Sequence, residues 1–485
     1  ALSCRIANQM LALGLPKETK GAVWAGNDVT AWACTLGLWR ANMTWIPVNA
    51  RNSPSENQHT LASFDCEVLF YQQQFAPVIA PLRDVLTRIV HWVCIDGDDG
   101  ATPSLTRWCG AQAATLPDVS IDMDDVVILS ATGGTTGLPK GVMNTHRTVQ
   151  TFVAHFMMAC TYRDGQLPVN LAAAPITHTA GVLSLPCTAQ GGTVVVVTKP
   201  DPALMLHAIA HHRVTEFFLP PTVIYKLLEI PGIDQVDFSS VKYLLYGAAP
   251  MSVEKLKKAI QLWGPIMTGG YGQSEAMTGI CNLRPDEHMR HGQLADDNRL
   301  SSVGRPNPLI RVEILDDEHR RVPPGETGEI CVKGDLVMKG YYKNPEKTAE
   351  TLIDGWLHTG DMGHLDAEGY LHITDRKKDM IISGGFNVYP SEVEQVLWSH
   401  PAVQDCAVIG VPDDTWGEAV KAVVELNPGA EVTEAELIAL CKEKLGGVMA
   451  PKSVDFIPSL PRSPVGKVLK KDLRNPYWAD AQRRI

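Results

Sequence analysis

Short apolar segments alternate with amphipathic segments of helical periodicity between residue 22 and about residue 270. This alternation is typical of β–α–β units, in which helices cover parallel strands. One intervening segment, MSVEKLKKAIQLW at 251–263, has its apolar residues at helical spacing. The candidate strands are AVWAG (22–26), EVLFY (67–71), VVILSA (126–131), TVVVVT (193–198), EFFLP (216–220) and YLLYG (243–247). The pattern predicts an α/β fold with mostly parallel sheets and flanking helices.

The pattern changes after this region. Between about 300 and 376, Gly, Pro and Asp turns separate short strands, which indicates a β-rich subdomain. The remaining chain has a compact α+β pattern, with one helix opening at Pro390 and another over 433–445. Two strands, DCAVIGV and EAVKAVVEL, are expected between those helices. We therefore predict a small α+β domain at the C-terminal end.

Length and charge limit the functions that the chain can have. Because 485 residues exceed one ordinary hydrophobic core, we predict two domains, 1–376 and 377–485, divided in the charged stretch DRKKD. The net charge of -11 argues against nucleic acid as the main partner. No segment approaches the roughly 18 consecutive apolar residues of a transmembrane span, and no secretory signal is recognisable.

The distribution of the cysteines predicts the redox environment of the protein. All 11 are scattered along the chain without a C-x-x-C pair. This distribution predicts buried thiols in a reducing, cytoplasmic environment, and neither a disulfide framework nor a zinc site.

The strongest local motif is LSATGGTTGLPKG at 129–141, which follows a candidate strand. Glycines let backbone N–H groups approach an anion, threonine hydroxyls add donors, and a lysine adds positive charge. We expect this loop to grip the β- and γ-phosphates of a nucleotide, although it lacks the G-x-x-x-x-G-K-[ST] order of a Walker A loop. The candidate phosphate-binding residues are Thr132, Gly133, Gly134, Thr135, Thr136, Gly137 and Lys140.

The segment ATGGTTGLPKG resembles the phosphate-loop signature of the adenylate-forming superfamily, which includes acyl-CoA synthetases, peptide-synthetase adenylation domains and luciferases. Gly133 stands where that family usually has Ser. Further motifs of the family occur in the same order over nearly the whole chain. The resemblance implies an N-terminal adenylation domain, a mobile C-terminal lid, and ATP, Mg²⁺ and coenzyme A as the molecules bound.

The segments YGAAPMS (246–252) and GGYGQSEA (269–276) resemble the family's adenine- and magnesium-binding motifs. Tyr271 is expected to stack on adenine. Glu275 is expected to hold Mg²⁺, which typically takes one or two carboxylates plus phosphate oxygens. The other expected nucleotide contacts are small or hydroxyl-bearing: Gly247, Ala248, Ala249, Gly272 and Ser274, the last in place of the usual Thr.

GWLHTGD (355–361) places Asp361 where the family binds the ribose hydroxyls, and a carboxylate is a natural acceptor for a diol. DRKKDMIISGG (375–385) places Arg376 at a second ribose position and Lys378 at the family's hinge. Taken alone, this charge run would be assigned to a solvated surface. Its position between two predicted domains favours the functional interpretation.

PRSPVGKVLKKDL (461–473) resembles the C-terminal motif of the family's catalytic lysine, here Lys467. The resemblance implies that Lys467 bridges the substrate carboxylate and the nucleotide during adenylation. Rotation about Lys378 would then withdraw Lys467 and bring SGGFNVYP (383–390) to a pantetheine channel. Gly384 and Gly385 are expected to let that thin chain pass.

His178, in PITHTAG, matches the family's mobile position beside the acyl group, although a lone histidine can also be a buried structural residue. We count His178 among the catalytic candidates, with Lys467 and Glu275. An amino-acid-activating domain would be expected to have an Asp within 174–181, and there is none. The expected acyl pocket is small or apolar apart from His178 and one hydroxyl: His178, Gly181, Val182, Thr222, Gly247, Gly269, Gly270 and Met277.

These residues favour an aromatic, alicyclic or medium-chain acid, with small hydroxylated acids left open. Only 18 residues follow Lys467, so we expect no fused carrier domain and favour coenzyme A as the acceptor. The predicted function is an ATP-dependent acyl-CoA ligase. Three alternatives remain open: a ligase that loads a free-standing carrier protein, a luciferase-like oxygenase and a non-catalytic nucleotide-binding protein. The sequence also leaves a homodimer open.

Overall fold

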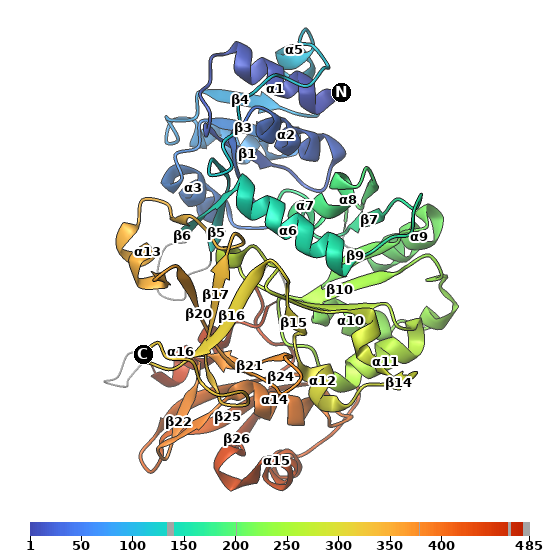
Figure 1. The fold of residues 1–485 in the computed structure, drawn as a ribbon, viewed down its shortest axis with the longest axis vertical. Coiled ribbons are helices and arrows are strands. Elements are labelled where there is room, and N and C mark those ends of the chain that lie inside the picture. Colours follow the sequence, from blue (N-terminus) through green and yellow to red (C-terminus); the bar gives the residue numbers. More distant parts are fainter. Residues whose placement is uncertain (133–139, 200, 378, 464–466, 479–485) are drawn as a thin grey trace.

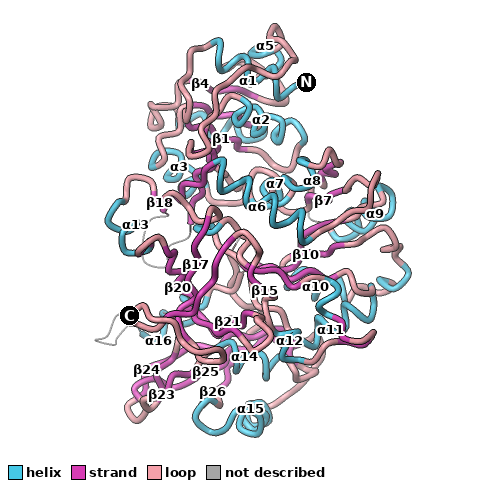
Figure 2. Tube along the Cα trace, in the orientation of Figure 1, coloured by secondary structure: helices cyan, strands magenta, loops and turns pink. Residues whose placement is uncertain are grey.

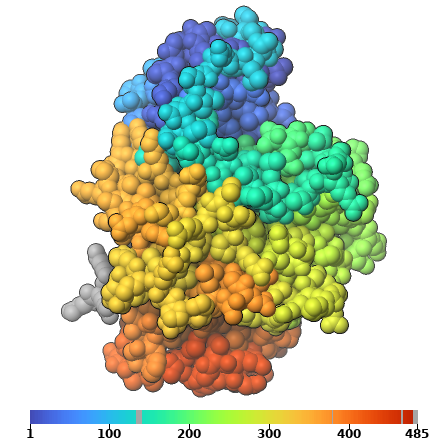
Figure 3. Space-filling view, in the orientation of Figure 1, coloured from blue at the N-terminus to red at the C-terminus, as the bar shows by residue number. Residues whose placement is uncertain are grey.

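The computed structural model describes residues 1–132, 140–199, 201–377, 379–463 and 467–478. The N-terminal helices and the last sheet lie at opposite ends of the molecule, with the β-rich region between them (Figures 1 and 3). Helices and strands alternate through the N-terminal half (Figure 2). The architecture is the mixed α/β fold that the sequence predicts.

The first sheet has seven strands. In the spatial order given next, the strands from β5 to β4 run parallel to one another. In spatial order they are β18 (Gly340–Tyr341), β6 (Lys140–Thr145), β5 (Val126–Thr132), β2 (Thr44–Ile46), β1 (Lys20–Trp24), β3 (Val68–Tyr71) and β4 (His91–Cys94). The helices of this part are α1 (Leu2–Ala12), α2 (Val29–Arg40), α3 (Pro54–Ser63), α4 (Ala76–Ile79) and α5 (Leu105–Cys109). Strand β18 comes from much later in the chain and pairs antiparallel with β6.

The second sheet also has seven strands, and its parallel part runs from β11 to β8. Its order is β15 (Arg305–Pro306), β12 (Cys281–Leu283), β11 (Met267–Tyr271), β10 (Tyr243–Gly247), β9 (Glu216–Leu219), β7 (Val169–Ala172) and β8 (Thr193–Val196). Its helices are α6 (His146–Ala159), α7 (Thr179–Leu183), α8 (Leu185–Ala189), α9 (Pro202–His212), α10 (Pro221–Leu228), α11 (Val253–Trp263) and α12 (Asp297–Ser301). A small hairpin, β13 (Met289–Arg290) and β14 (Gln293–Leu294), follows.

The β-rich region forms a third, five-stranded antiparallel sheet. Its strands are β16 (Ile310–Leu315), β17 (Gly328–Gly334), β20 (Trp356–Leu365), β19 (Leu352–Ile353) and β21 (Leu371–Arg376), with the helix α13 (Pro345–Thr351) before β19. Ile330 and Leu357 of this sheet pack in the same hydrophobic core as Phe152 of α6 and Trp45 of β2. The third sheet is therefore continuous with the body formed by the first two.

The C-terminal part is built on a fourth sheet with a core of its own. Its strands are β23 (Phe386–Val388), β22 (Ile381–Ser383), β25 (Gly417–Leu426), β24 (Val403–Asp413) and β26 (Ser453–Phe456), and its helices are α14 (Pro390–Trp398), α15 (Glu434–Met449) and α16 (Lys470–Trp478). The helix predicted to open at Pro390, the helix predicted over 433–445 and both predicted strands are confirmed.

Local sequence signals explain where these elements begin. Ser53 and Glu56 form a capping box at the start of α3, and Thr433 and Glu436 form one at α15. The parallel strand β3 is buried along its whole length, which is why it reads as one apolar run. In the described ranges, every helix is too short or too polar to span a lipid bilayer.

Candidate functional site

The carboxyl ends of β10 and β11 lie side by side in the second sheet, where ligands of open α/β sheets usually bind. β10 ends at Gly247 and β11 at Tyr271. A Cβ atom on Gly247 would lie 2.5 Å from the carbonyl oxygen of Gly270, so any side chain there would push the two strands apart. The exposed Ala248 follows with a φ of 66°, a left-handed conformation that few non-glycine residues adopt. Ala249 is half-buried beside it.

Tyr271, Asp361 and Arg376, the residues predicted to contact adenine and ribose, form one connected group. The Tyr271 hydroxyl donates to Asp361 Oδ2 at 2.7 Å, and Arg376 Nε lies 3.3 Å from Asp361 Oδ1. Asp361 and Arg376 are register partners on β20 and β21. Burial, followed by Asp361, raises the pKa of Tyr271 well above its ordinary value, so the phenol remains a proton donor.

Glu275 lies in the 3₁₀ turn Ser274–Ala276 and is fixed by the strand that closes the first sheet. Its Oε1 accepts a hydrogen bond from the Tyr341 hydroxyl at 2.8 Å, and its backbone carbonyl accepts one from Met338 N at 2.9 Å. Asn144 of β6 donates to the carbonyl of Ser274 at 3.3 Å. The predicted magnesium ligand is thus held beside the strand that follows the phosphate loop.

Thr132 and Lys140 are register partners where β5 and β6 open into the loop. Lys140 Nζ lies 5.1 Å from the centroid of the Tyr341 ring, the same ring whose hydroxyl reaches Glu275. The cation at the loop and the candidate metal ligand are therefore joined through one tyrosine. The other predicted loop residues, Gly133, Gly134, Thr135, Thr136 and Gly137, lie outside the described residues.

Tyr341 was not predicted from the sequence. Burial and then Glu275 raise the pKa of this phenol, so it donates to the carboxylate at neutral pH. The sequence feature that could have identified it is the pair of adjacent tyrosines after Gly340, but this pair is equally typical of a short apolar strand. What identifies Tyr341 is the pairing of β18 with β6, which brings it to Val142.

His178 is the residue before α7, in an uncommon backbone conformation with φ −148° and ψ −122°. Its Nδ1 lies 2.8 Å from Thr179 Oγ1. Asn27 holds the preceding segment, donating to the Ala174 carbonyl and accepting from Ile176 N. Burial lowers the pKa of His178, which favours the neutral ring at pH 7.

The other predicted acyl-pocket residues lie on α7, α10, β10, β11 and the turn after it: Gly181, Val182, Thr222, Gly247, Gly269, Gly270 and Met277. Gly181 is explained by local packing as well as by the space that a substrate would need. A Cβ atom on Gly181 would lie 2.2 Å from the Ile176 carbonyl oxygen and 2.5 Å from the Trp32 ring. Gly272, a predicted nucleotide contact, is similarly tight, with Thr278 backbone atoms 2.4 Å from its would-be Cβ.

Four predicted residues belong to the C-terminal part, and the structure describes three of them. Gly384 and Gly385 have φ of 58° and 83° and form the two-residue turn between β22 and β23. Both lie exposed at this hairpin tip, and paired positive φ values explain the Gly-Gly sequence. Lys467 is exposed, and its backbone N–H and carbonyl bond to Ser463 at 3.2 and 2.8 Å. The predicted hinge residue, Lys378, lies outside the described residues.

The donor set fits a nucleotide with a magnesium ion. Asp361 contacts Tyr271 through one oxygen and Arg376 through the other, and it keeps lone pairs for a diol, since a carboxylate offers about four acceptor positions. Glu275 uses one such position for Tyr341 and retains others for a cation. Magnesium needs only one or two protein carboxylates when phosphate oxygens complete its shell. Lys140 adds the positive charge that a polyphosphate requires.

Comparisons with known proteins match this geometry. The sequence profile described as AMP-binding enzyme matches residues 1–342, and the profile described as AMP-binding enzyme C-terminal domain matches residues 392–467. The chain is 41% identical to the medium/long-chain-fatty-acid–CoA ligase FadD8 of Mycobacterium tuberculosis, over 77% of this chain and 64% of FadD8. It is 35% identical to a feruloyl-CoA synthase of an Amycolatopsis species, over 98% of this chain and 92% of that enzyme.

A solved structure agrees with the fold over nearly the whole chain. The amide bond synthetase McbA from Marinactinospora thermotolerans superposes with a TM-score of 0.88 at 30% identity, covering 98% of this chain and 93% of McbA.

Proposed function

The chain belongs to the family of AMP-binding enzymes, and from that premise we propose that it is an ATP-dependent acyl-CoA ligase. It activates a carboxylic acid as an acyl-adenylate with release of pyrophosphate, and then transfers the acyl group to coenzyme A. Two observations carry the proposal: the group formed by the buried Tyr271 and Asp361 with Arg376, and the Glu275–Tyr341–Lys140 contact. We assign the first group to adenine and ribose and the second to Mg²⁺ and the polyphosphate.

In the first half-reaction, a substrate carboxylate oxygen attacks the α-phosphorus and the bond to the β-phosphate bridging oxygen breaks. Negative charge grows on the departing pyrophosphate, and positioned cations and N–H donors lower its energy. Lys140 and the loop at 133–139 would face the β- and γ-phosphates, and Lys467 would bridge the carboxylate and the nucleotide. When bound through Glu275, Mg²⁺ would neutralise phosphate charge.

In the second half-reaction, the thiolate of coenzyme A attacks the acyl carbon and AMP leaves with the bonding electrons. The proposal divides the chain into 1–376 and 377–485, with rotation of the second part about Lys378. β21 ends at Arg376 and the fourth sheet begins at Ile381, so the division falls between two separately packed cores. The exposed tip at Gly384 and Gly385 is free to approach a pantetheine chain after rotation.

The acid is proposed to be aromatic, alicyclic or of medium chain length. Support comes from a neutral His178, from the small or apolar residues around it and from the absence of an acidic residue in 174–181. The similar enzymes include both a fatty-acid ligase, FadD8, and an aromatic-acid ligase, the feruloyl-CoA synthase, so this likeness does not choose between the two acid classes. The 11 buried, unpaired thiols favour a reducing compartment such as the cytoplasm.

The test is acid-dependent release of pyrophosphate from ATP and Mg²⁺ across a panel of carboxylic acids, with and without coenzyme A. Faster release with coenzyme A, together with AMP and an acyl-CoA of the expected mass, supports the proposal. Release that ignores coenzyme A but responds to a phosphopantetheinyl carrier protein supports the carrier-loading alternative. Absence of release with every acid contradicts adenylation itself. Light scattering of the same sample tests a homodimer.

A further inference from the structure

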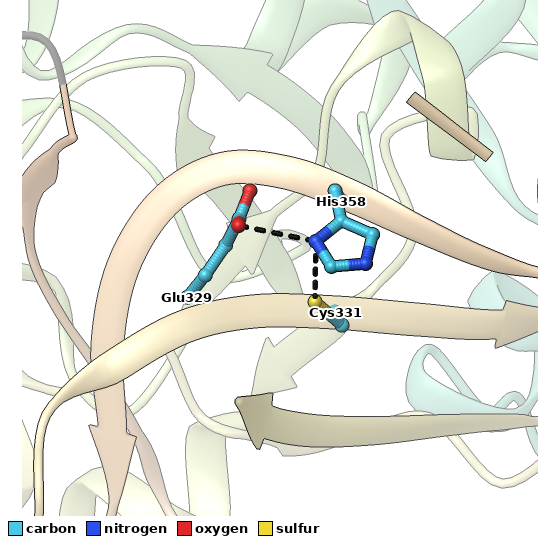
Figure 4. Close-up of side chains that lie close together, drawn as sticks. All are labelled: Glu329, Cys331 and His358. Atoms are coloured by element: carbon cyan, nitrogen blue, oxygen red, sulfur yellow. Dashed lines mark hydrogen bonds and ion pairs between the residues drawn. The ribbon is translucent and has the colours of Figure 1, made fainter. Parts of the chain in front are cut away.

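Three side chains that commonly bind metals meet between two strands of the third sheet, outside the nucleotide contacts. Glu329 and Cys331 lie on β17, and His358 lies on β20 (Figure 4). Cys331 Sγ is 3.4 Å from His358 Nδ1, and that same nitrogen is 3.1 Å from Glu329 Oε2. The three ligand atoms all lie within 4.8 Å of one another.

We propose that Cys331, His358 and Glu329 form a binding site for one divalent transition-metal ion of the zinc type. A tetrahedral zinc ion holds sulfur at about 2.3 Å and nitrogen or oxygen at about 2.0–2.2 Å, which separates neighbouring ligand atoms by roughly 3.3–3.6 Å. The observed Sγ–Nδ1 and Nδ1–Oε2 separations of 3.4 and 3.1 Å are already close to those values. A thiolate, an imidazole and a carboxylate also select zinc or cobalt over magnesium or calcium.

Hydrogen bonding alone can use both contacts of His358 Nδ1 only if one N–H is shared between the carboxylate and the sulfur. Nδ1 of a neutral imidazole either carries a proton or accepts one, so His358 cannot donate to Glu329 and accept from the Cys331 thiol at once. A metal ion satisfies all three atoms together. One proton leaves Sγ as the sulfur–metal bond forms, because the ligand is the thiolate.

The backbone holds the ligands in place before any ion binds. Cys331 and His358 are direct register partners, and Glu329 lies two residues along β17 on the same face. Cys331 is fully buried, whereas the side chains of His358 and Glu329 are 9% and 16% exposed. The ion would therefore enter from the Glu329 and His358 side and could keep a water molecule as its fourth ligand.

Metal binding would also stabilise the neighbouring bulge in β20. Between the Cys331–His358 and Glu329–Met362 pairs the register shifts, so β20 has extra residues opposite Glu329. These extra residues include Gly360, whose N–H donates to Glu329 Oε1 at 3.0 Å, and Asp361. A bound ion would fix the carboxylate that holds this bulge, and with it the Asp361 backbone. The metal site itself does not depend on which reaction the protein catalyses.

Cobalt(II) titration of the chelator-treated full chain tests the site, because a cobalt–thiolate bond gives a near-ultraviolet charge-transfer band. The expected result is one equivalent of Co²⁺ per chain with that band and tetrahedral visible absorption, reversed by Zn²⁺. Cys331→Ser should lose the charge-transfer band. Cys66→Ser, which alters an equally buried thiol in the hydrophobic core beside the first sheet, should retain it. A band that persists in Cys331→Ser, or a wild-type protein without the band, would overturn the proposal.

A second variant guards against a folding defect in Cys331→Ser. Glu329→Gln keeps an oxygen that accepts from Gly360 N but removes the ligand charge. Its Co²⁺ affinity should fall at least about tenfold, the scale seen when partners of a metal ligand are lost, with the thermal unfolding of the apo protein little changed. Unchanged affinity would contradict a role for Glu329 as a ligand and with it the three-ligand site.

Discussion

The Tyr271 hydroxyl donates to Asp361 Oδ2 at 2.7 Å, joining the end of the second sheet to the bulged strand of the third across 90 residues of chain. Both residues are buried, so the bond fixes the ring face and the carboxylate relative to each other. The proposed adenine and ribose contacts are therefore positioned as a unit.

Tyr271→Phe should weaken ATP binding more than it slows chemistry. The ring remains for stacking, but Asp361 loses one buried donor, which leaves it Arg376 among the described residues. We expect a several-fold rise in KM for ATP and a loss of about 1–3 kcal/mol in the free energy of unfolding, the usual cost of an unmatched buried hydrogen bond. Steady-state kinetics and urea unfolding measure the two effects. An unchanged KM for ATP would contradict the idea that Tyr271 and Asp361 position the nucleotide as a unit.

Tyr341→Phe should raise the Mg²⁺ concentration needed for half-maximal adenylation. The ring still lies near Lys140, but Glu275 loses the donor that orients it. The matched control is Tyr342→Phe, whose lost hydroxyl instead bonds to Asp65. If both variants have the same Mg²⁺ dependence as the wild type, Tyr341 does not position the metal ligand.

Lys467→Ala should abolish most adenylation while sparing thioester formation from a synthetic acyl-adenylate. In the proposed mechanism, the first half-reaction needs the Lys467 cation near the carboxylate, and the second proceeds with the C-terminal part rotated away. The two steps are measured separately, by pyrophosphate release and by acyl-CoA formation. Equal losses in both would rule out alternation of the C-terminal part in this protein.

Lys470→Met should destabilise the C-terminal part. Lys470 Nζ lies 2.8 Å from Glu394 Oε1 and 3.6 Å from Asp375 Oδ2, and both carboxylates are buried. Removing the cation leaves Glu394 uncompensated, which typically costs about 3–5 kcal/mol. Lys442→Met, at an exposed position of α15, should change the free energy of unfolding by less than about 0.5 kcal/mol. Urea unfolding followed by tryptophan fluorescence compares them, and similar small losses would show that the buried pair is dispensable.

Acid should destabilise the protein partly through His288. Its Nδ1 faces the Arg284 carbonyl at 2.8 Å and its Nε2 faces the Tyr246 hydroxyl at 3.0 Å, an arrangement that suits the neutral ring. Burial lowers the pKa of His288 to about 4, whereas the unfolded chain takes up this proton near pH 6.5. Stability is therefore intact above about pH 6.5 and is lost as the pH falls toward 4, by up to about 3 kcal/mol.

Comparison of wild type with His288→Gln isolates this contribution from those of other groups. Glutamine stays neutral throughout, so the variant should lose less stability between pH 7 and 5 in urea unfolding. Parallel pH profiles of the two proteins would show that His288 is not the responsible group.

Sequence reasoning succeeded where a single segment contains its own signal. The apolar run at β3 and the Gly-Gly tip between β22 and β23 each encode a local structure. It failed where the partner lies elsewhere in the chain: the contact of Glu275 with Tyr341 spans 66 residues, and Cys331 meets His358 only because β17 and β20 pair. The expectation of no zinc site rested on the absence of a C-x-x-C pair, and the cobalt titration proposed for the Cys331–His358 cluster tests that expectation.

Strand β18 lies far along the chain from its partner β6, and this separation affects folding during synthesis. Val142 and Met143 lie on a strand whose partners, Tyr341 and Gly340, emerge from the ribosome almost 200 residues later. Until then the nascent chain carries an open strand edge, the kind of surface on which neighbouring chains associate. Fragments that stop before residue 340 should therefore be prone to aggregate, because the first sheet is complete at that edge only after Tyr341 has been made.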